Sequence, residues 1–241
     1  MEYFTKPGKE KVVLKPNLIN DRSPPTTTSC ETVEALVKYY CVDYEVVIAE
    51  GSGWCETSRA FRVLGYFKMA EKYGVKIVDL NQDEYEVRKN PRAICLNKFE
   101  LPSTLKDSYL ISVPVLKEHS LTTVTISLKN MLGATLGEET RATWKKGRFH
   151  DRLDASIVDI NLYLKPNLAV VDGRVAGVGG ELGALPENHG VMIFSEDLVA
   201  ADAVGAKMLG YDPLDIRHLK LAQDKGLGVA DLGNIEVLEV R

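Results

Sequence analysis

The chain has 241 residues, of which 45% are hydrophobic and 27% charged, and its formal net charge is −4. This length and hydrophobic content suffice for a sizeable core, and we expect a single domain over residues 1–241. Acidic and basic residues are interspersed without a basic cluster, which argues against a nucleic-acid partner. No stretch reaches the roughly 20 apolar residues that a membrane span needs, and residues 1–11 lack the apolar core of a signal peptide. The composition predicts a cytoplasmic protein with no membrane partner.

The cysteines are too widely spaced to predict a metal site or a cluster. They form no C-x-x-C pair, and no histidine follows them at a metal-ligand spacing. We therefore expect reduced thiols and no iron–sulfur cluster held by this chain. The four positions are Cys30, Cys41, Cys55 and Cys95.

Strands and helices are predicted to alternate in the first third of the chain. Residues 11–14, 45–49 and 76–80 are short apolar runs typical of buried strands. Between them, the apolar spacing within residues 33–40 and from Phe61 onward predicts helices. Parallel strands need crossover connections, and helices usually make them. The chain is thus predicted to form a mostly parallel central sheet with helices on both faces, a Rossmann-like three-layer α/β fold.

The middle of the chain contains one regular segment and two less regular ones. Residues 82–108 alternate polar and apolar positions and predict a small β excursion. Residues 109–113 are apolar and predict a buried strand that ends before Pro114. Residues 122–132 fit either one face of a helix or a half-buried strand. We favour the helix, because a crossover helix commonly follows a parallel strand.

The last third of the chain is predicted to continue the alternation. Ser195 and Asp197 are suitable caps for the helix that follows them, and Asp202 lies inside that helix. His218 is expected on the surface of a later helix. The expected helices cover residues 151–164, 198–208 and 215–224, and the expected strands cover residues 167–171, 191–194 and 235–240.

Polar residues and glycines follow several of the predicted strands. Strands of one parallel sheet end at the same edge, where α/β proteins bind ligands. We therefore assign these residues to ligand binding: Lys15, Asn17, Glu50, Gly51, Asp172 and Gly173. The glycine turn at residues 51–53 could contact a phosphate or carboxylate, but it lacks the remaining glycine and lysine of the nucleotide motifs, and a plain tight turn is the preferred interpretation.

The stretch after residues 109–113 carries a cation, an imidazole and an amide within a short distance. Lysines can bind or polarise an anion, and a histidine suits acid–base chemistry because its pKa lies near neutral pH. Asn130 is a further candidate for ligand binding. The candidate catalytic residues are Lys117, His119, Lys129 and His150.

Residues 141–150 are polar and mixed in charge. Two interpretations are open, a solvated loop and a lid that closes over an anion and excludes water. We expect this segment to be less ordered than the neighbouring helices in the absence of ligand, because it offers few apolar contacts.

The chain resembles the prokaryotic family catalogued as domain of unknown function 362. Relatives often carry an appended ferredoxin-type iron–sulfur module, and this chain departs from that pattern. The resemblance implies a shared site without naming a reaction. It spans nearly the whole chain and rests on Lys15-Pro-Asn17, Glu50-Gly51, Lys117-x-His119, Ser127-Leu-Lys129-Asn130, His150, Asp172-Gly173 and Ser195-x-Asp197 with Asp202.

The candidate residues and the resemblance lead to two hypotheses about function, which belong to different classes. The first is an enzyme that acts on a small anionic metabolite by lysine and histidine acid–base chemistry, with a variant in which His119, His150 and Asp172 hold a divalent metal. The alternative is a non-catalytic binding or accessory protein that works with an iron–sulfur redox partner, as the resemblance implies. The enzyme hypothesis predicts that one cleft is faced by Lys15, Lys117, His119, Lys129, Asn130 and His150.

Overall fold

A computed structural model describes residues 4–138 and 143–240. The strands of its main sheet are β1 (Lys11–Pro16), β2 (Glu45–Glu50), β3 (Lys76–Asp79), β6 (Tyr109–Val113), β7 (Val115–His119), β8 (Thr123–Thr125), β9 (Leu168–Val178) and β10 (Leu185–Ser195). They lie in the order β3-β2-β1-β6-β9-β7-β8, and β10 pairs with β9. β8 and β10 are antiparallel to their partners, and the remaining pairings are parallel. The predicted mostly parallel sheet is confirmed.

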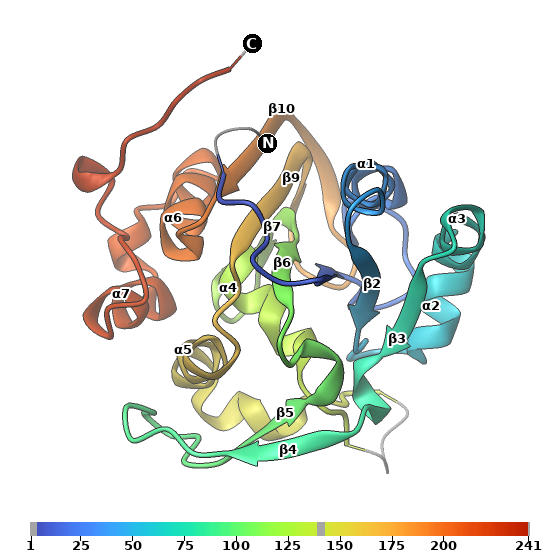
Figure 1. Ribbon diagram of the computed structural model, residues 1–241. Helices are drawn as coiled ribbons and strands as arrows, with labels where there is room; N and C mark the ends of the chain where they lie inside the picture. Colours follow the sequence, from blue (N-terminus) through green and yellow to red (C-terminus); the bar gives the residue numbers. More distant parts are fainter. Residues whose placement is uncertain (1–3, 139–142, 241) are drawn as a thin grey trace.

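Helices cover both faces of this sheet (Figure 1). α1 (Cys30–Tyr40), α2 (Thr57–Val63) and α3 (Tyr66–Tyr73) lie on one side, and α4 (Ser127–Asn130), α5 (Leu153–Leu164), α6 (Leu198–Met208) and α7 (Arg217–Asp224) lie on the other. Short 3₁₀ segments lie at Leu80–Gln82, Ser103–Leu105, Met131–Ala134, Gly147–Arg152, Pro213–Asp215 and Leu232–Asn234. The predicted three-layer α/β fold is therefore confirmed.

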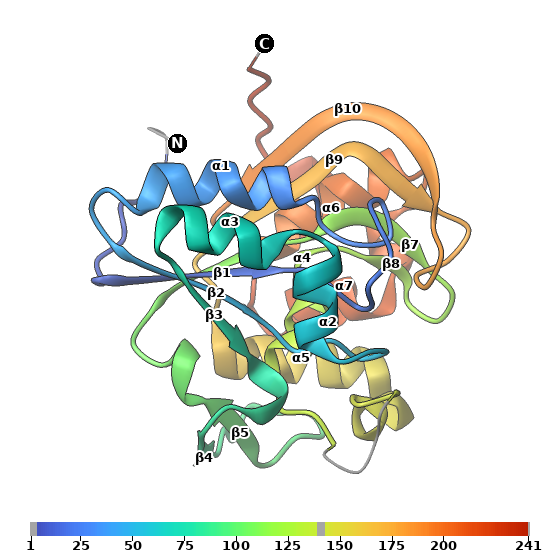
Figure 2. The ribbon, with the colours of Figure 1, turned by 90° about the vertical axis from the view of Figure 1, so that its right-hand side faces the viewer.

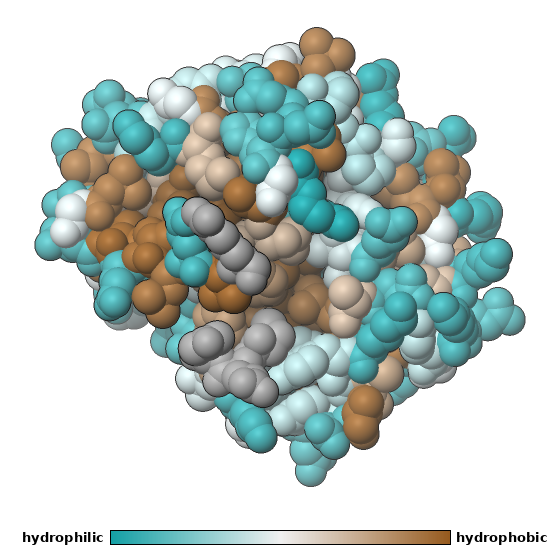
Figure 3. Space-filling model, turned by 90° about the horizontal axis from the view of Figure 1, so that it is seen from above, coloured by the Kyte–Doolittle hydropathy of each residue, from teal (hydrophilic) through white to brown (hydrophobic). Residues whose placement is uncertain are grey.

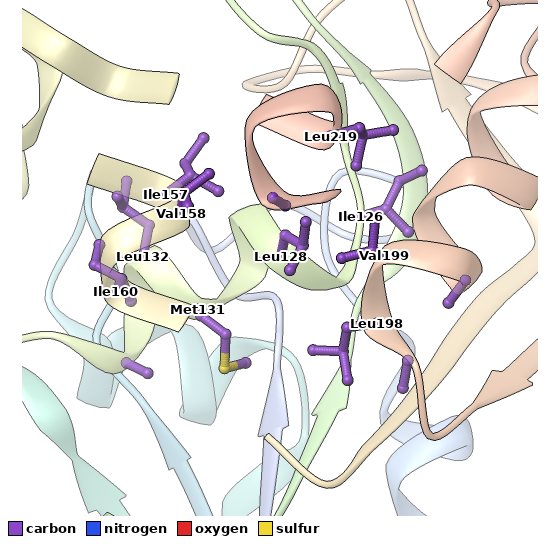
Figure 4. Close-up of a cluster of buried hydrophobic side chains, with 14 of the residues drawn as sticks. Ile126, Leu128, Met131, Leu132, Ile157, Val158, Ile160, Leu198, Val199 and Leu219 are labelled. Carbon is purple, nitrogen blue, oxygen red and sulfur yellow. The ribbon is translucent and has the colours of Figure 1, made fainter. Parts of the chain in front are cut away.

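Each face of the sheet has its own apolar core. On the α1 side, Leu14 of β1 packs with Val37 of α1 and Phe61 of α2. On the other side, the short helix α4 is surrounded by apolar residues of α5, α6 and α7 (Figure 4). Burying one large aliphatic side chain contributes about 1.5–3 kcal/mol, so this packing can hold a single-turn helix that would not form alone. α4 matters below because it carries Lys129 and Asn130.

Local sequence signals set several helix ends. The Ser29 side chain caps α1 by accepting a hydrogen bond from the backbone N–H of Glu31 at 3.3 Å, and Asp197 caps α6 through Ala200 at 2.9 Å. Gly65 separates α2 from α3 with φ at 84°, a left-handed conformation that favours glycine. The predicted cap at Asp197 is confirmed, whereas Ser195 accepts from the N–H of Asp197 and does not cap the helix itself.

The segment after β6 differs from its prediction. The chain continues past Pro114 as β7, which forms a hairpin with β8 in which Lys117 faces Thr125 and His119 faces Thr123. The alternating pattern of residues 122–126 was the correct signal there, and the helix expected from residue 122 begins only at Ser127. The helix prediction was wrong for its first half, because an antiparallel partner was available that local periodicity does not reveal.

Asp172 and Gly173 do not end a strand, as was expected from the sequence. They lie inside β9, which continues to Val178 because β10 runs beside it antiparallel over most of its length. Figure 2 shows these two long strands arching side by side over one end of the molecule. The predicted β excursion is confirmed as a separate two-stranded sheet of β4 (Tyr85–Arg88) and β5 (Phe99–Pro102).

The strand expected at residues 235–240 is not present. This tail leaves the body of the molecule without a neighbouring strand (Figures 1 and 2), and β-forming residues need a partner to pair with. Val237, Leu238 and Val240 remain 58%, 73% and 81% exposed. Figure 3 views the end of the molecule at which both termini lie, where hydrophobic side chains gather in the middle and on one side.

His218 is fully buried on α7 and does not lie on the surface as expected. Its Nδ1 atom lies 3.5 Å from a carboxylate oxygen of Asp154, and burial lowers the pKa of its imidazole. The helical spacing placed α7 correctly, but a histidine on its inner face looks like a polar surface residue in the sequence. Within the described residues, no helix combines the length and the apolarity that crossing a bilayer requires.

Candidate functional site

A small cavity lies beside the carboxyl ends of β1 and β2, and its volume is about 50 Å³. It has room for a few waters or a compact ligand and is far smaller than the usual small-molecule pocket of roughly 300–1,000 Å³. Its wall comes from the β1 and β2 ends, the β7–β8 hairpin, α4 and two later loops. It is lined by Asn17, Ile19, Glu50, Gly51, Gly53, Lys117, His119, Thr125, Lys129, Asn130, Leu132, Gly133, Lys146 and Glu181.

Behind this wall, Lys15 and Glu50 form a buried ion pair. The Lys15 Nζ atom lies 2.9 Å from each carboxylate oxygen of Glu50, and both side chains are at most 2% exposed. Nζ also donates to the backbone oxygen of Pro16 at 2.7 Å and to Asn130 Oδ1 at 3.0 Å. Three kinds of acceptor match the three N–H donors of an ammonium group. Burial lowers the pKa of Lys15, and the charge of Glu50 opposes that shift.

Asn130 and Glu50 also tie the pair to the surrounding backbone. Asn130 Nδ2 donates to the backbone oxygen of Lys15 at 2.8 Å, and Glu50 accepts from the backbone N–H groups of Leu18 and Gly51, both at 2.7 Å. Asn17 reaches the same network by donating to Asn130 Oδ1 at 3.3 Å. These contacts fix the side chains that the sequence assigned to ligand binding, so their first structural role is to hold the cavity wall together.

Two glycines allow this close packing. A Cβ atom added to Gly133 would collide with the Glu50 carboxylate and would lie 2.8 Å from Lys15 Nζ. A Cβ atom added to Gly51 would lie 2.9 Å from both Asn81 Oδ1 and Lys146 Nζ. The N–H of Gly51 is already used by Glu50, and the helix after it, α2, is a short one. Close packing therefore requires glycine at both positions, and contact between the glycine turn and a ligand stays a prediction.

Lys117 enters the cavity from β7 and is 1% exposed. Its Nζ atom donates to the backbone oxygens of Thr26 at 2.7 Å and Glu181 at 3.3 Å. Burial, and then the positive charge of Lys129, lowers the pKa of Lys117 to about 7. Neutral carbonyls hold this amine, and no carboxylate among the described residues pairs with it at bonding distance.

Lys129 projects from α4 and is 7% exposed. No other residue within 4–138 and 143–240 forms a hydrogen bond or ion pair with its Nζ atom. Burial lowers the pKa of Lys129 to about 8, opposed mainly by the charge of Glu181. Lys129 therefore lines the cavity with no bonded partner in the described part of the chain.

Lys146 reaches the cavity from the predicted lid, of which residues 141 and 142 lie outside the described residues. Its Nζ atom donates to the backbone oxygen of Thr135, and burial lowers the pKa of Lys146 to about 7. Lys145 is also buried, and its side chain pairs with Glu56 at 2.8 Å. The described part of the segment buries Lys145, Lys146 and Phe149, while Trp144 remains 38% exposed. That it is less ordered than the helices stays a prediction.

His119 and Glu181 face each other across the wall. His119 Nδ1 accepts hydrogen bonds from the backbone N–H groups of Leu121 at 3.0 Å and Thr122 at 3.4 Å, which places the imidazole proton on Nε2. Nε2 lies 3.8 Å from Glu181 Oε1. Burial and the charge of Lys129 lower the pKa of His119 to about 3, so it is a neutral donor at physiological pH.

His150 does not line the cavity. Its Nδ1 atom lies 3.0 Å from the backbone oxygen of Lys146, and its ring lies against Trp144 with centroids 4.7 Å apart. Of the six residues predicted to share one cleft, Lys117, His119, Lys129 and Asn130 line the wall. Lys15 lies directly behind it and His150 supports the Lys146 loop.

Asp172 and Gly173 also lie away from the wall. Asp172 is held by Arg174, whose guanidinium is 2.8 Å away, and by the hydroxyl of Thr32. Gly173 packs against Val191 and Leu116. Within the described residues, no three histidine, cysteine or acidic side chains form a group that could hold a metal ion. The metal site predicted from His119, His150 and Asp172 is therefore not assembled.

Three residues that the sequence did not assign as catalytic or binding residues shape the site. Lys146 and Glu181 come from loops, and no local pattern indicates where a loop side chain points. Asp202 of α6 caps α4 by accepting from the N–H groups of Ser127 at 2.7 Å and Leu128 at 2.9 Å. Its position inside a helix was noted from the sequence, and a carboxylate on the buried face of an apolar helix was the available signal.

The chain matches known proteins over most of its length. A family model described as "Domain of unknown function (DUF362)" matches residues 12–207. The thylakoid-associated protein sll1697 of Synechocystis sp. is 28% identical over 240 residues, which cover 94% of this chain and 71% of that protein. No solved structure matches the chain. The matched family region contains every residue that lines the cavity.

Proposed function

We propose that this chain, which belongs to the DUF362 family, binds a small anionic metabolite in the cavity and acts on it by lysine and histidine acid–base chemistry. The observation that carries this proposal is an excess of buried positive charge. Lys117, Lys129 and Lys146 line the wall together with two carboxylates, Glu50 and Glu181. Glu50 is already paired with Lys15. Among the described residues of the wall, one carboxylate therefore remains for three buried lysines.

A bound anion would relieve this imbalance. Burying an unpaired ammonium is costly, and the protein can avoid that cost either by releasing the proton or by taking up an anion. Two acidic residues nearby do not supply the missing charge in the cavity. Asp79 is engaged by Thr57 and Asn81, and Asp154 faces His218. The size of the cavity restricts the anion to a compact one.

The same groups support proton transfer. A general acid or base works best when its pKa lies near the working pH. Lys117 and Lys146 have pKa values of about 7 and can take up and return a proton there. His119 presents Nε2–H toward Glu181 and can donate a hydrogen bond to an oxygen of the ligand.

Thermal unfolding with a panel of formate, acetate, pyruvate and phosphate tests the proposal. At least one anion should raise the melting temperature of the wild type, and Lys117→Met should abolish that rise. Lys68→Met removes an exposed lysine and should leave the rise intact. Binding should weaken as the pH increases through about 7 and 8, because the lysines lose their protons. Equal shifts in both variants would locate the anion elsewhere and contradict the proposal.

The location of the protein and its partners are also proposals. We keep the cytoplasmic location predicted from the sequence, and the relative's name says only that that protein is thylakoid-associated. Separation of membrane and soluble fractions of native cells checks this. An iron–sulfur protein as a partner stays a prediction. A divalent metal bound by a different set of ligands also stays a prediction. No contact among the described residues supports either one.

A further inference from the structure

We propose that Lys129 is the amine that forms a covalent imine with a carbonyl group of the ligand, and that the ligand is a small oxo acid. This inference rests on the proposed function, because it concerns the same cavity. It adds the chemical class of the substrate and assigns one residue to bond formation. Four buried lysines lie at or behind the wall, and their surroundings distinguish them.

Three of the four amines are held by the protein. Lys15 is held by three residues, through both oxygens of Glu50, the backbone oxygen of Pro16 and Oδ1 of Asn130. Lys117 donates to two backbone oxygens, and Lys146 donates to one. A held amine must break these bonds before its lone pair can attack a carbonyl carbon.

Lys129 has no such restraint among the described residues, yet its position is fixed. Lys129 lines the cavity, and its Nζ atom has no hydrogen-bond partner among the described residues. Its helix is anchored by Asp202 at one end, and Asn161 Nδ2 donates to the backbone oxygen of Leu128 at 2.9 Å. An amine on an anchored helix that faces a cavity lined by other cations meets the requirements for a nucleophilic lysine.

The wall also supplies what an oxo acid requires. Lys117 and Lys146 can pair with the carboxylate of the ligand, and Glu181 and His119 are close to each other on the same wall. The carbonyl carbon is then left to face Lys129. A compact oxo acid such as pyruvate or glyoxylate has both groups on neighbouring carbons, which suits the small volume.

The bond formation balances without any other reactant. The lone pair of Lys129 Nζ forms the N–C bond, and the carbonyl π electrons move to oxygen, which takes a proton. Glu181, whose charge acts on Lys129, can pass the nitrogen's proton to that oxygen. The hydroxyl takes the second proton of the nitrogen, passed through Glu181 in the same way, and leaves as water when the nitrogen lone pair forms the C=N bond. The products are one imine and one water molecule.

Reductive trapping tests the inference on the full chain. The wild type is incubated with pyruvate or with glyoxylate at pH 7.5, treated with sodium cyanoborohydride and digested for mass spectrometry. An ordinary lysine is neutral in only about one molecule in a thousand at this pH. We expect Lys129 to be modified at least about tenfold faster than exposed Lys68 in the same sample. Lys129→Arg should abolish that fast modification while Lys68 still reacts slowly.

The outcomes separate this inference from the proposed function. If pyruvate raises the melting temperature through Lys117 but Lys129 is not modified faster than Lys68, the imine is wrong and anion binding stands. Fast modification at Lys117 or Lys146 instead also overturns the assignment to Lys129. If neither oxo acid modifies Lys129 and no anion of the panel shifts the melting temperature, both proposals fail. Because trapping is measured on the wild type, the result does not depend on a variant that folds.

Discussion

Lys15 and Lys129 are buried lysines at the same cavity, but their amines have opposite surroundings. Lys15 lies between the two oxygens of Glu50 and further acceptors, whereas Lys129 has no bonded partner among the described residues. Removing one partner of a buried ion pair lowers the free energy of unfolding, because a buried charge is left without a partner. A buried cation that has no partner already lowers the stability of the folded state. The comparison indicates that Lys15 stabilises the structure, and we propose that Lys129, with Lys117 and Lys146, binds a ligand.

The largest loss of stability should come from breaking the ion pair between Lys15 and Glu50. Glu50→Gln keeps the size of the side chain but leaves Lys15 without a counter-charge, and the free energy of unfolding should fall by about 3–5 kcal/mol. Urea unfolding at pH 7 measures this. Glu56→Gln is the matched control, since Glu56 pairs with Lys145 but is 56% exposed, and its effect should be much smaller. Similar losses in both variants would show that Lys15 does not depend on Glu50.

A smaller loss is expected when the support of α4 is removed. Asp202→Ala leaves the N–H groups of Ser127 and Leu128 without their acceptor, which should cost about 1–3 kcal/mol. Because α4 carries Lys129, anion-induced stabilisation should weaken as well. Asp202→Asn retains one acceptor oxygen and should fall between the wild type and Asp202→Ala. A normal anion response in Asp202→Ala would show that the position of α4 is not needed for binding.

The three buried lysines of the cavity wall should make the free energy of unfolding depend on pH. Their pKa values in the fold, about 7 for Lys117 and Lys146 and about 8 for Lys129, lie below the usual value of 10.5. Between these lowered pKa values and 10.5, the lysines are largely neutral in the folded protein but protonated in the unfolded chain. The unfolded chain therefore binds more protons, and the free energy of unfolding should rise with pH. Lys117→Met should reduce this slope by up to about 1 kcal/mol per pH unit between pH 8 and 10.

A saturating anion should flatten the same slope below about pH 8, because it holds the lysines in their charged form. The measurement is a series of urea unfolding curves across this pH range, with and without the anion. Stability that falls between pH 7 and 10 in the wild type would have the opposite sign and would refute the assignment of lowered pKa values.

The smallest effect is expected at His150. Its ring contacts Trp144 and the Lys146 backbone but does not line the cavity, so His150→Ala should lose about 0.5–1.5 kcal/mol of stability. The anion affinity should change by less than about threefold, which corresponds to under 1 kcal/mol. Isothermal titration provides the comparison with Lys117→Met. A complete loss of binding in His150→Ala would place this histidine in contact with the ligand.

The sequence allowed the fold class and part of the site to be predicted. Apolar runs separated by helical spacing identified the parallel sheet, and the rule that strands end at one edge identified Lys15 and Glu50 correctly as neighbours. The rule failed for Asp172, because the strand around it continues beside β10 and the residue lies within it. The end of a strand depends on its partner, and partners are distant in the sequence.

The remainder of the site depends on loops and on the inner faces of helices. Lys146 and Glu181 reach the cavity from loops whose course is set by tertiary packing. His218 was expected in solvent because periodicity alone does not distinguish a buried histidine from an exposed one. Lys117 was identified for its position after a strand, although the segment that carries it is itself a strand.

The central claim is that the buried lysines bind an anion inside the cavity. Crystals of the wild type grown in bromide and measured at the bromine absorption edge test this directly, since a single bromide ion fits a cavity of about 50 Å³. We predict an anomalous peak between the Nζ atoms of Lys117, Lys129 and Lys146, and no such peak in Lys117→Met crystals. Peaks confined to the protein surface, with an empty cavity in the wild type, would contradict the account.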